Sequence, residues 1–154
     1  MYTGRNKLNA RANITSLPKE SEEQIALFEW AEVLKRKWPS LEYMYHIPNG
    51  GSRNAIEACN LKKQGVKPGI PDIFLPDARG GAFGLYIEMK RIAGGVVSDY
   101  QAEAIKNLRK QGYYADVCDG FQKAADLIEW YMSLPPTAVQ NDFCEINKRE
   151  PFFG

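Results

Sequence analysis

The sequence predicts an α/β fold in which a mixed central sheet is flanked by helices. Several segments repeat apolar residues at helical spacing, and short runs rich in β-branched and aromatic residues lie between them. Two of these runs are separated only by a turn and can pair as a hairpin, whereas the others are separated by helices. The chain has 154 residues, of which 44% are hydrophobic, so one domain with a substantial core is expected.

The first helix is expected to begin at Ser21, after an arm formed by residues 1–20. The segment 21–24 (Ser-Glu-Glu-Gln) has the pattern of a capping box, in which the serine and the glutamine satisfy free backbone donors. Apolar residues follow at helical spacing: Leu27, Ala31, Leu34 and Trp38. Pro39 is expected to end this helix, and the tyrosine-rich residues 41–47 are predicted to form a strand.

Loops alternate with short elements in the middle of the chain. Residues 46–53 are rich in turn-forming residues, and a short helix is predicted from Ala55 to Gln64, before Gly65. Asp72 to Leu75 and Gly84 to Arg91 are predicted to be the two strands of the hairpin.

The last third of the chain is predicted to continue as helix, strand and helix. The helices are expected at Ser98 to Gln111 and at residues 121–133, with a strand at Tyr113 to Cys118 between them. Pro135 and Pro136 should stop the last helix, and residues 134–154 are interpreted as a tail. The domain itself is therefore predicted to span residues 21–133.

Composition argues against several kinds of site. Three widely spaced cysteines, Cys59, Cys118 and Cys144, do not suit a disulfide framework or a zinc knuckle, and a single histidine, His46, excludes a site built on several histidines. Reduced thiols and the lack of a signal-peptide core or of an apolar run of ~20 residues predict a cytoplasmic protein without a membrane span.

The net charge of +1 conceals an uneven distribution. Residues 53–110 contain ten Lys or Arg against six Asp or Glu, whereas residues 111–154 contain three against seven. A basic middle segment can attract phosphate groups, although a solvated surface would have the same composition.

The chemistry is predicted to centre on Asp72, Glu88 and Lys90. Glu88 and Lys90 are two residues apart on a strand, so they share one face with Tyr86. If Asp72 begins the neighbouring strand of the hairpin, two carboxylates and an ammonium group converge at one edge of the sheet. Magnesium prefers oxygen ligands and uses one or two protein carboxylates, so this arrangement suits a magnesium ion that activates water for phosphodiester hydrolysis. By itself, an acidic-x-Lys triplet can also be an ordinary solvated face.

Several ordered motifs resemble the VRR-NUC nucleases, which belong to the restriction-endonuclease-like superfamily of PD-(D/E)xK enzymes. The similar segments are Gly50-Gly51, residues 65–72 (ending in Pro71-Asp72), residues 88–90 (Glu-Met-Lys) and residues 98–101 (Ser-Asp-Tyr-Gln). The resemblance extends from about Ser21 to Met132 and is closest to standalone members of bacteria and phages. It implies a restriction-endonuclease-like core and a location in the bacterial or phage-infected cell.

The resemblance also implies roles for individual residues. Asp72 and Glu88 would bind the metal, with the carbonyl of Met89 as a further ligand, and Lys90 would act on the attacking water. Gln101 would serve the active site, although Ser98 to Gln101 also fits a capping box.

The resemblance further implies one glutamate from the first helix at the metal site. Glu22 and Glu23 both qualify, and Glu23 is preferred because it lies on the same helical stripe as Leu27 and Ala31. The alternative is that both glutamates only interact favourably with the positive end of the helix dipole.

DNA contacts are expected from two groups of residues. One surrounds the glycine-rich loop, where the backbone can approach a phosphate closely, and the other lies on the following helix and loop. The candidates are His46, Asn49, Arg53, Lys62, Lys63 and Lys67. A structural histidine and exposed lysines that only promote solubility are the alternatives.

The function expected from the sequence is metal-dependent hydrolysis of DNA phosphodiester bonds, with Mg²⁺ as cofactor and Mn²⁺ as a substitute. The resemblance to standalone members implies a homodimer acting on branched DNA such as four-way (Holliday) junctions. A less selective endonuclease or nickase is the alternative, followed by a non-catalytic DNA-binding module and by a glycosidase that uses Asp72 and Glu88 as its carboxylate pair.

Overall fold

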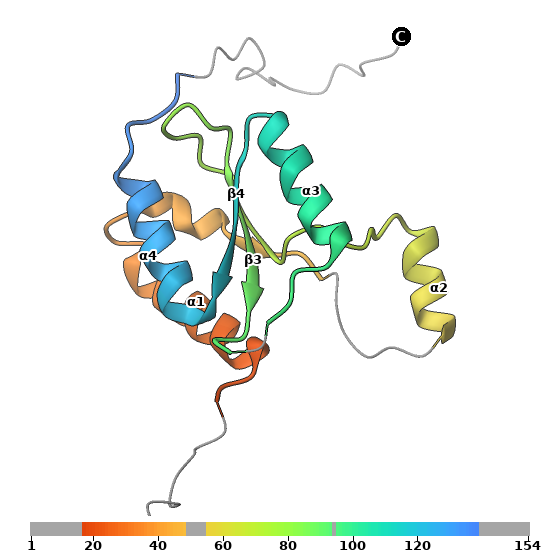
Figure 1. The fold of residues 1–154 in the computed structure, drawn as a ribbon. Helices are drawn as coiled ribbons and strands as arrows, with labels where there is room; N and C mark the ends of the chain where they lie inside the picture. Colours follow the sequence, from red (N-terminus) through yellow and green to blue (C-terminus); the bar gives the residue numbers. More distant parts are fainter. Residues whose placement is uncertain (1–16, 49–54, 94, 139–154) are drawn as a thin grey trace, which may run out of the picture.

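A mixed four-stranded sheet forms the centre of the protein, as predicted (Figure 1). The computed structural model describes residues 17–48, 55–93 and 95–138. The strands lie in the order β1-β2-β3-β4, and their bounds are Tyr45–His46, Ile73–Leu75, Leu85–Lys90 and Tyr114–Asp119. The first three strands pair antiparallel, and β4 pairs parallel to β3 because α3 connects them as a crossover.

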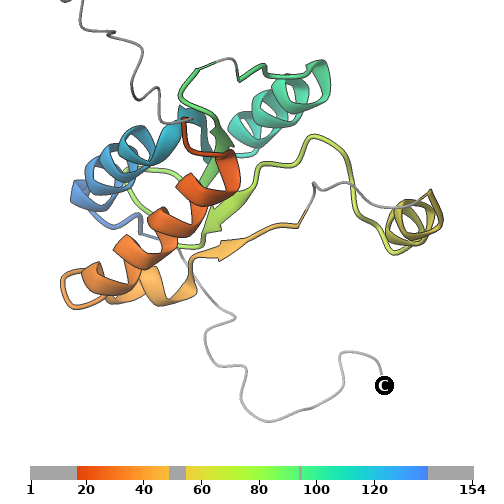
Figure 2. The same cartoon turned by 90° about the horizontal axis from the view of Figure 1, so that it is seen from below.

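Helices cover the two faces of the sheet unequally (Figure 2). α1 (Glu20–Leu34) and α4 (Gly120–Ser133) pack against each other and against β3 on one face. On the other face α3 (Asp99–Lys110) packs against β4. α2 (Ala55–Lys63) stands away from the sheet and packs against no other described helix or strand. None of the described helices has the length and apolar character needed to cross a membrane.

The main core lies between the sheet and the α1–α4 pair. Alternation along β3 places Leu85, Ile87 and Met89 on this side, where each is fully buried. The helices contribute mainly Leu27, Ala31, Ala124, Ile128 and Tyr131. The helical and strand periods read from the sequence therefore identify the core correctly.

Three details of residues 17–47 differ from the prediction, and one of them is that α1 ends at Leu34 rather than at Pro39. α1 begins at Glu20, and its N-terminus is capped by Glu22, whose carboxylate accepts a hydrogen bond from the Lys19 N–H at 2.8 Å. The predicted capping box at Ser21 is wrong, because an acidic side chain satisfies the free donor two residues earlier.

The predicted strand at residues 41–47 is also largely wrong. Pro39–Tyr43 forms a 3₁₀ helix, and only Tyr45–His46 pair with β2. The buried residues of this segment, Leu41 and Met44, are three apart, which is the spacing of one face of a 3₁₀ helix. Leu and Tyr alternate with other residues in this segment, as in a strand, but the segment does not pack as one.

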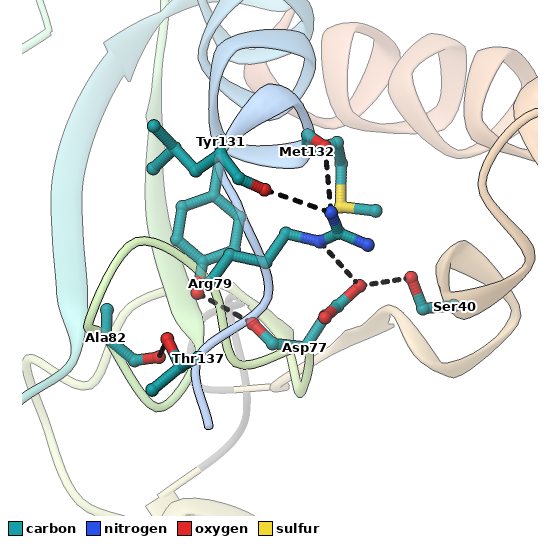
Figure 3. Close-up of polar contacts among 8 residues, drawn as sticks. Ser40, Asp77, Arg79, Ala82, Tyr131, Met132 and Thr137 are labelled. Carbon is teal, nitrogen blue, oxygen red and sulfur yellow. Dashed lines mark hydrogen bonds and ion pairs between the residues drawn. The ribbon is translucent and has the colours of Figure 1, made fainter. Parts of the chain in front are cut away.

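A cluster of polar contacts ties the β2–β3 loop to the end of α4 (Figure 3). Arg79 donates to the carbonyls of Met132 and Leu134 at 3.0 and 3.1 Å, and to Asp77 at 3.0 Å. The Tyr131 hydroxyl donates to the Asp77 carbonyl at 2.7 Å. Arg79 thus satisfies carbonyl groups left free at a helix C-terminus, and the cluster holds the hairpin against the core helix.

The beginning of the predicted tail belongs to the same region. Thr137 donates its backbone N–H to the Ala78 carbonyl at 2.8 Å, and its hydroxyl accepts from the Gly81 N–H at 2.9 Å. Residues 134–138 are therefore bound to the hairpin loop.

Candidate active site

The hairpin brings Asp72, Glu88 and Lys90 together at the C-terminal end of β3. Ile73 pairs with Ile87, so the antiparallel register places Asp72 beside Glu88. The Asp72 carboxylate accepts a hydrogen bond from the Met89 N–H at 2.9 Å, and the Lys90 ammonium lies 2.6 Å from Glu88 Oε1. Sequence spacing alone predicted this convergence correctly.

The site is more enclosed than the sequence suggested. β3 is an interior strand between β2 and β4, and Glu88 and Lys90 are only 1% and 7% exposed. A solvent-reachable carboxylate at a sheet edge was expected for Glu88, and that expectation is wrong. A buried lysine–glutamate pair is costly unless further groups compensate both charges, so such pairs are often retained for function.

Gln101 completes the contacts of Glu88 from the first turn of α3. Its Nε2 group donates to Glu88 Oε1, the oxygen that also accepts from Lys90. Its Oε1 atom accepts from the Ser98 N–H at 2.9 Å, which is the predicted capping box. The sequence treated the cap and the site contact as alternatives, but one amide side chain makes both because its two ends point in opposite directions.

The backbones of Gly69 and Tyr100 lie very close together, which holds α3 against the segment that leads into Asp72. Gly69 has a φ of +84°, and a Cβ atom at this position would lie 2.5 Å from the Tyr100 carbonyl. Only glycine tolerates both conditions. The chain entering Asp72 can therefore lie directly against the residue preceding Gln101.

Burial strongly affects the ionisation of the two carboxylates. Desolvation raises the pKa of Glu88 to about 7, the Lys90 hydrogen bond opposes the rise, and the charge of Asp72 adds to it. Desolvation also raises the pKa of Asp72, opposed first by the Met89 hydrogen bond and then by the charge of Lys90. Both carboxylates would be favoured in their charged form by a nearby cation.

We expect the free energy of unfolding of the metal-free protein to fall as pH rises from about 4.5 to above 7. The pKa of Glu88 is raised from 4.5 to about 7 in the folded state, so folding favours the protonated form and loses this contribution as the carboxyl ionises. A rise in pKa from 4.5 to about 7 corresponds to about 3 kcal/mol. Urea unfolding in EDTA across this range would measure it. Glu88→Gln should flatten the slope, and an unchanged slope in that variant would contradict the assignment.

The three glutamates at the start of α1 have different surroundings. Glu23 is buried, as its place on the apolar stripe requires, but its carboxylate accepts from the Phe121 N–H at 2.6 Å at the start of α4. Glu22 caps α1. It is Glu20 whose charge acts on Glu88 and raises its pKa. Glu20 lies one helical turn before Glu23 on the same face of the helix. The sequence could have identified it, but the helix was predicted to begin only at Ser21.

Glu23→Ala is expected to lower stability because it leaves the partly buried Phe121 N–H without its carboxylate partner. The loss should be about 1–3 kcal/mol, which lowers the melting temperature by several degrees. Differential scanning calorimetry would measure it. Glu29→Ala is the matched control, because Glu29 is exposed on the same helix. Equal melting temperatures for the two variants would show that the Glu23 contact contributes nothing.

The predicted DNA-binding residues are only partly placed near this centre. The His46 Nδ1–H donates to the Asp72 carbonyl at 2.8 Å, which ties β1 to the residue before β2. Lys62 and Lys63 are exposed on α2 and Lys67 on the following loop, away from the sheet. Asn49 and Arg53 lie outside the described residues.

The carboxylate pair passes a structural test for a bound cation. Glu88 Oε2 is buried and has no hydrogen-bond partner among the described residues, so one charged oxygen is left for another ligand. No cluster of three or more His, Cys, Asp or Glu side chains forms in the described part of the chain. A magnesium ion, which uses few protein carboxylates and keeps several waters, fits a donor set of two carboxylates with one free oxygen.

Comparisons with known proteins identify the family of this chain. The model of the VRR-NUC domain family matches residues 8–122. A solved structure described as "VRR_NUC domain protein" is similar with a TM-score of 0.66 and 32% sequence identity, covering 77% of this chain and 92% of that one. A search of functionally curated proteins finds no match. The sequence match and the shared fold together show that this chain belongs to the VRR-NUC domain family, a family of nuclease-type domains.

Proposed function

We propose that this protein is a magnesium-dependent endonuclease that hydrolyses DNA phosphodiester bonds. The observation that carries the proposal is the group of Asp72, Glu88 and Lys90, in which Glu88 and Lys90 are buried and one glutamate oxygen has no hydrogen-bond partner among the described residues. A carboxylate pair with a free oxygen can hold the ion that assists phosphodiester hydrolysis, and a neighbouring lysine can stabilise negative charge on the phosphate.

Asp72 and Glu88 would hold the magnesium ion, with Glu20 from α1 adding negative charge nearby. The Met89 carbonyl remains a further candidate ligand. The ion, when bound, supplies Lewis-acid polarisation of the phosphate and lowers the pKa of a bound water. Mn²⁺ should substitute, because it prefers the same oxygen ligands.

Lys90 would orient the attacking water and offset negative charge that develops on the phosphate. Its ammonium group is held 2.6 Å from Glu88 Oε1, so it is already positioned next to the carboxylate. Gln101 would orient Glu88 through the hydrogen bond to the same oxygen, which leaves Oε2 free to bind the metal.

The substrate that we propose is branched DNA such as four-way junctions, cut by a homodimer. Two sites related by a two-fold axis suit paired cuts in a symmetric junction. Lys62, Lys63 and Lys67 would contact the phosphate backbone from the projecting helix and loop, and His46 from its place beside Asp72. Asn49 and Arg53 stay candidates on the sequence alone. A less selective endonuclease or nickase is the second candidate, since the same active site serves both.

A plasmid-nicking assay in Mg²⁺, in Ca²⁺ and in excess EDTA tests the proposal. We expect cleavage with Mg²⁺ or Mn²⁺, none in EDTA, and binding without efficient turnover in Ca²⁺, because calcium's larger, flexible coordination shell aligns the reacting groups poorly. Full activity in EDTA would exclude the mechanism. DNA binding without cleavage in any metal would instead identify a non-catalytic module, and cleavage of glycosidic bonds would identify a glycosidase.

A further inference from the structure

A row of aromatic rings crosses the face of the sheet opposite the α1–α4 core. Tyr45, Phe74 and Tyr86 are register partners on β1, β2 and β3, and Tyr113 and Phe83 extend the row at one end. Ring centroids are 5.8 Å apart for Tyr45–Phe74, 4.3 Å for the stacked pair Phe74–Tyr86, and 5.3 Å for Tyr86–Tyr113. We call these five residues the aromatic row.

The aromatic row is accessible in the described part of the protein. Tyr45 and Phe83 are 50% and 53% exposed, and the three rings between them are partly exposed. α3 packs against β4 and α2 against no strand, so no described α-helix packs over β1 and β2 on this face. The Phe74 ring lies against the bare backbone of Gly84, where a Cβ atom would be 2.7 Å from the ring. The rings therefore pack against the sheet on one side and remain accessible to solvent on the other.

The row continues directly into the candidate active site. Tyr86 and Glu88 are two residues apart on the same face of β3, a separation of about 7 Å. Bases along one stacked strand are spaced by about 3.4 Å. A strand whose phosphodiester lies at Glu88 would therefore bring a base to Tyr86 within about two nucleotides.

We propose that the aromatic row binds unpaired bases of the DNA strand next to the phosphodiester that is cut. The inference rests on the proposed function and adds the feature of the substrate that is recognised. Tyrosine and phenylalanine side chains carry no charge near neutral pH, so the row does not repel phosphate. Aromatic faces stack on bases of any sequence, but only where the base faces are not already covered inside a duplex. Single-stranded stretches at a branch meet this condition.

The test is equilibrium binding in EDTA to a short single-stranded oligonucleotide that contains 2-aminopurine, and to its fully paired duplex. Tyr45→Leu keeps an apolar side chain but removes the ring. We expect it to lower affinity for the single strand about tenfold, with duplex affinity unchanged. 2-Aminopurine fluorescence should be quenched on binding wild type and less so on binding the variant. Tyr45→Phe should restore both signals. Tyr43→Leu is the control, because Tyr43 is 68% exposed and lies outside the row.

Two outcomes would overturn the proposal. Equal single-strand affinity for wild type and Tyr45→Leu would show that the row does not stack on bases. A shift of Tyr45→Leu from dimer to monomer in sedimentation would show that the row is an interface with a second copy. Because binding is measured without metal, a protein that binds single strands through the row but cuts nothing would contradict only the proposed nuclease activity. An active nuclease without preference for single strands would contradict only this inference.

Discussion

Glu88→Gln is expected to reduce the single-turnover rate of DNA cleavage by at least about 1,000-fold. The substitution removes the charged oxygen that no described residue contacts by a hydrogen bond and that is proposed to bind the metal. A catalytic metal ion contributes several kcal/mol to transition-state stabilisation, and each 1.4 kcal/mol corresponds to a factor of ten in rate. Asp72→Asn should have an effect of similar size, because the two carboxylates are proposed to share the ion.

Glu103→Gln provides the matched control, since Glu103 is an exposed glutamate on α3. Calorimetric titration with Mn²⁺ would show whether the rate loss accompanies a loss of metal binding. A Glu88→Gln protein that folds, binds Mn²⁺ as well as wild type and cleaves at a near wild-type rate would disprove the site assignment.

Lys90→Ala should cut DNA at least ~100-fold more slowly while binding it nearly as well as wild type. A group that acts on the attacking water contributes mainly in the transition state, so its loss lowers the chemical rate more than the affinity. Lys90 is suited to this role because its ammonium group is buried against Glu88 at 2.6 Å. Single-turnover cleavage and equilibrium binding on the same branched substrate would separate the two quantities.

Lys62→Ala should behave in the opposite way. Lys62 is exposed on α2, so its loss is expected to weaken binding and to reduce the salt dependence by about one counterion, with the single-turnover rate unchanged. If Lys90→Ala instead lost affinity and kept its rate, Lys90 would be a DNA-gripping residue and the proposed mechanism would lack its water-activating group.

Local spacing was sufficient to predict the central hairpin and the convergence of its polar side chains. The two-residue period of a strand places Glu88 and Lys90 on one face and Met89 in the core, and the structure has this arrangement. The capping box at Ser98 was equally visible, because it depends on residues within one helical turn. These features are encoded by neighbours in sequence, so no knowledge of distant contacts was needed.

The other features of the site depend on tertiary packing. Glu23 lies on the expected face of α1, but its carboxylate accepts a hydrogen bond from the Phe121 N–H because α4 begins beside it. Because α1 begins at Glu20, the charge of a different glutamate acts on Glu88. The burial of Glu88 depends on β4 pairing with β3 and on Gln101 reaching across from α3. Spacing along one segment determines which face a side chain occupies. What covers that face, and hence how strongly a carboxylate is desolvated, depends on segments far away in the sequence.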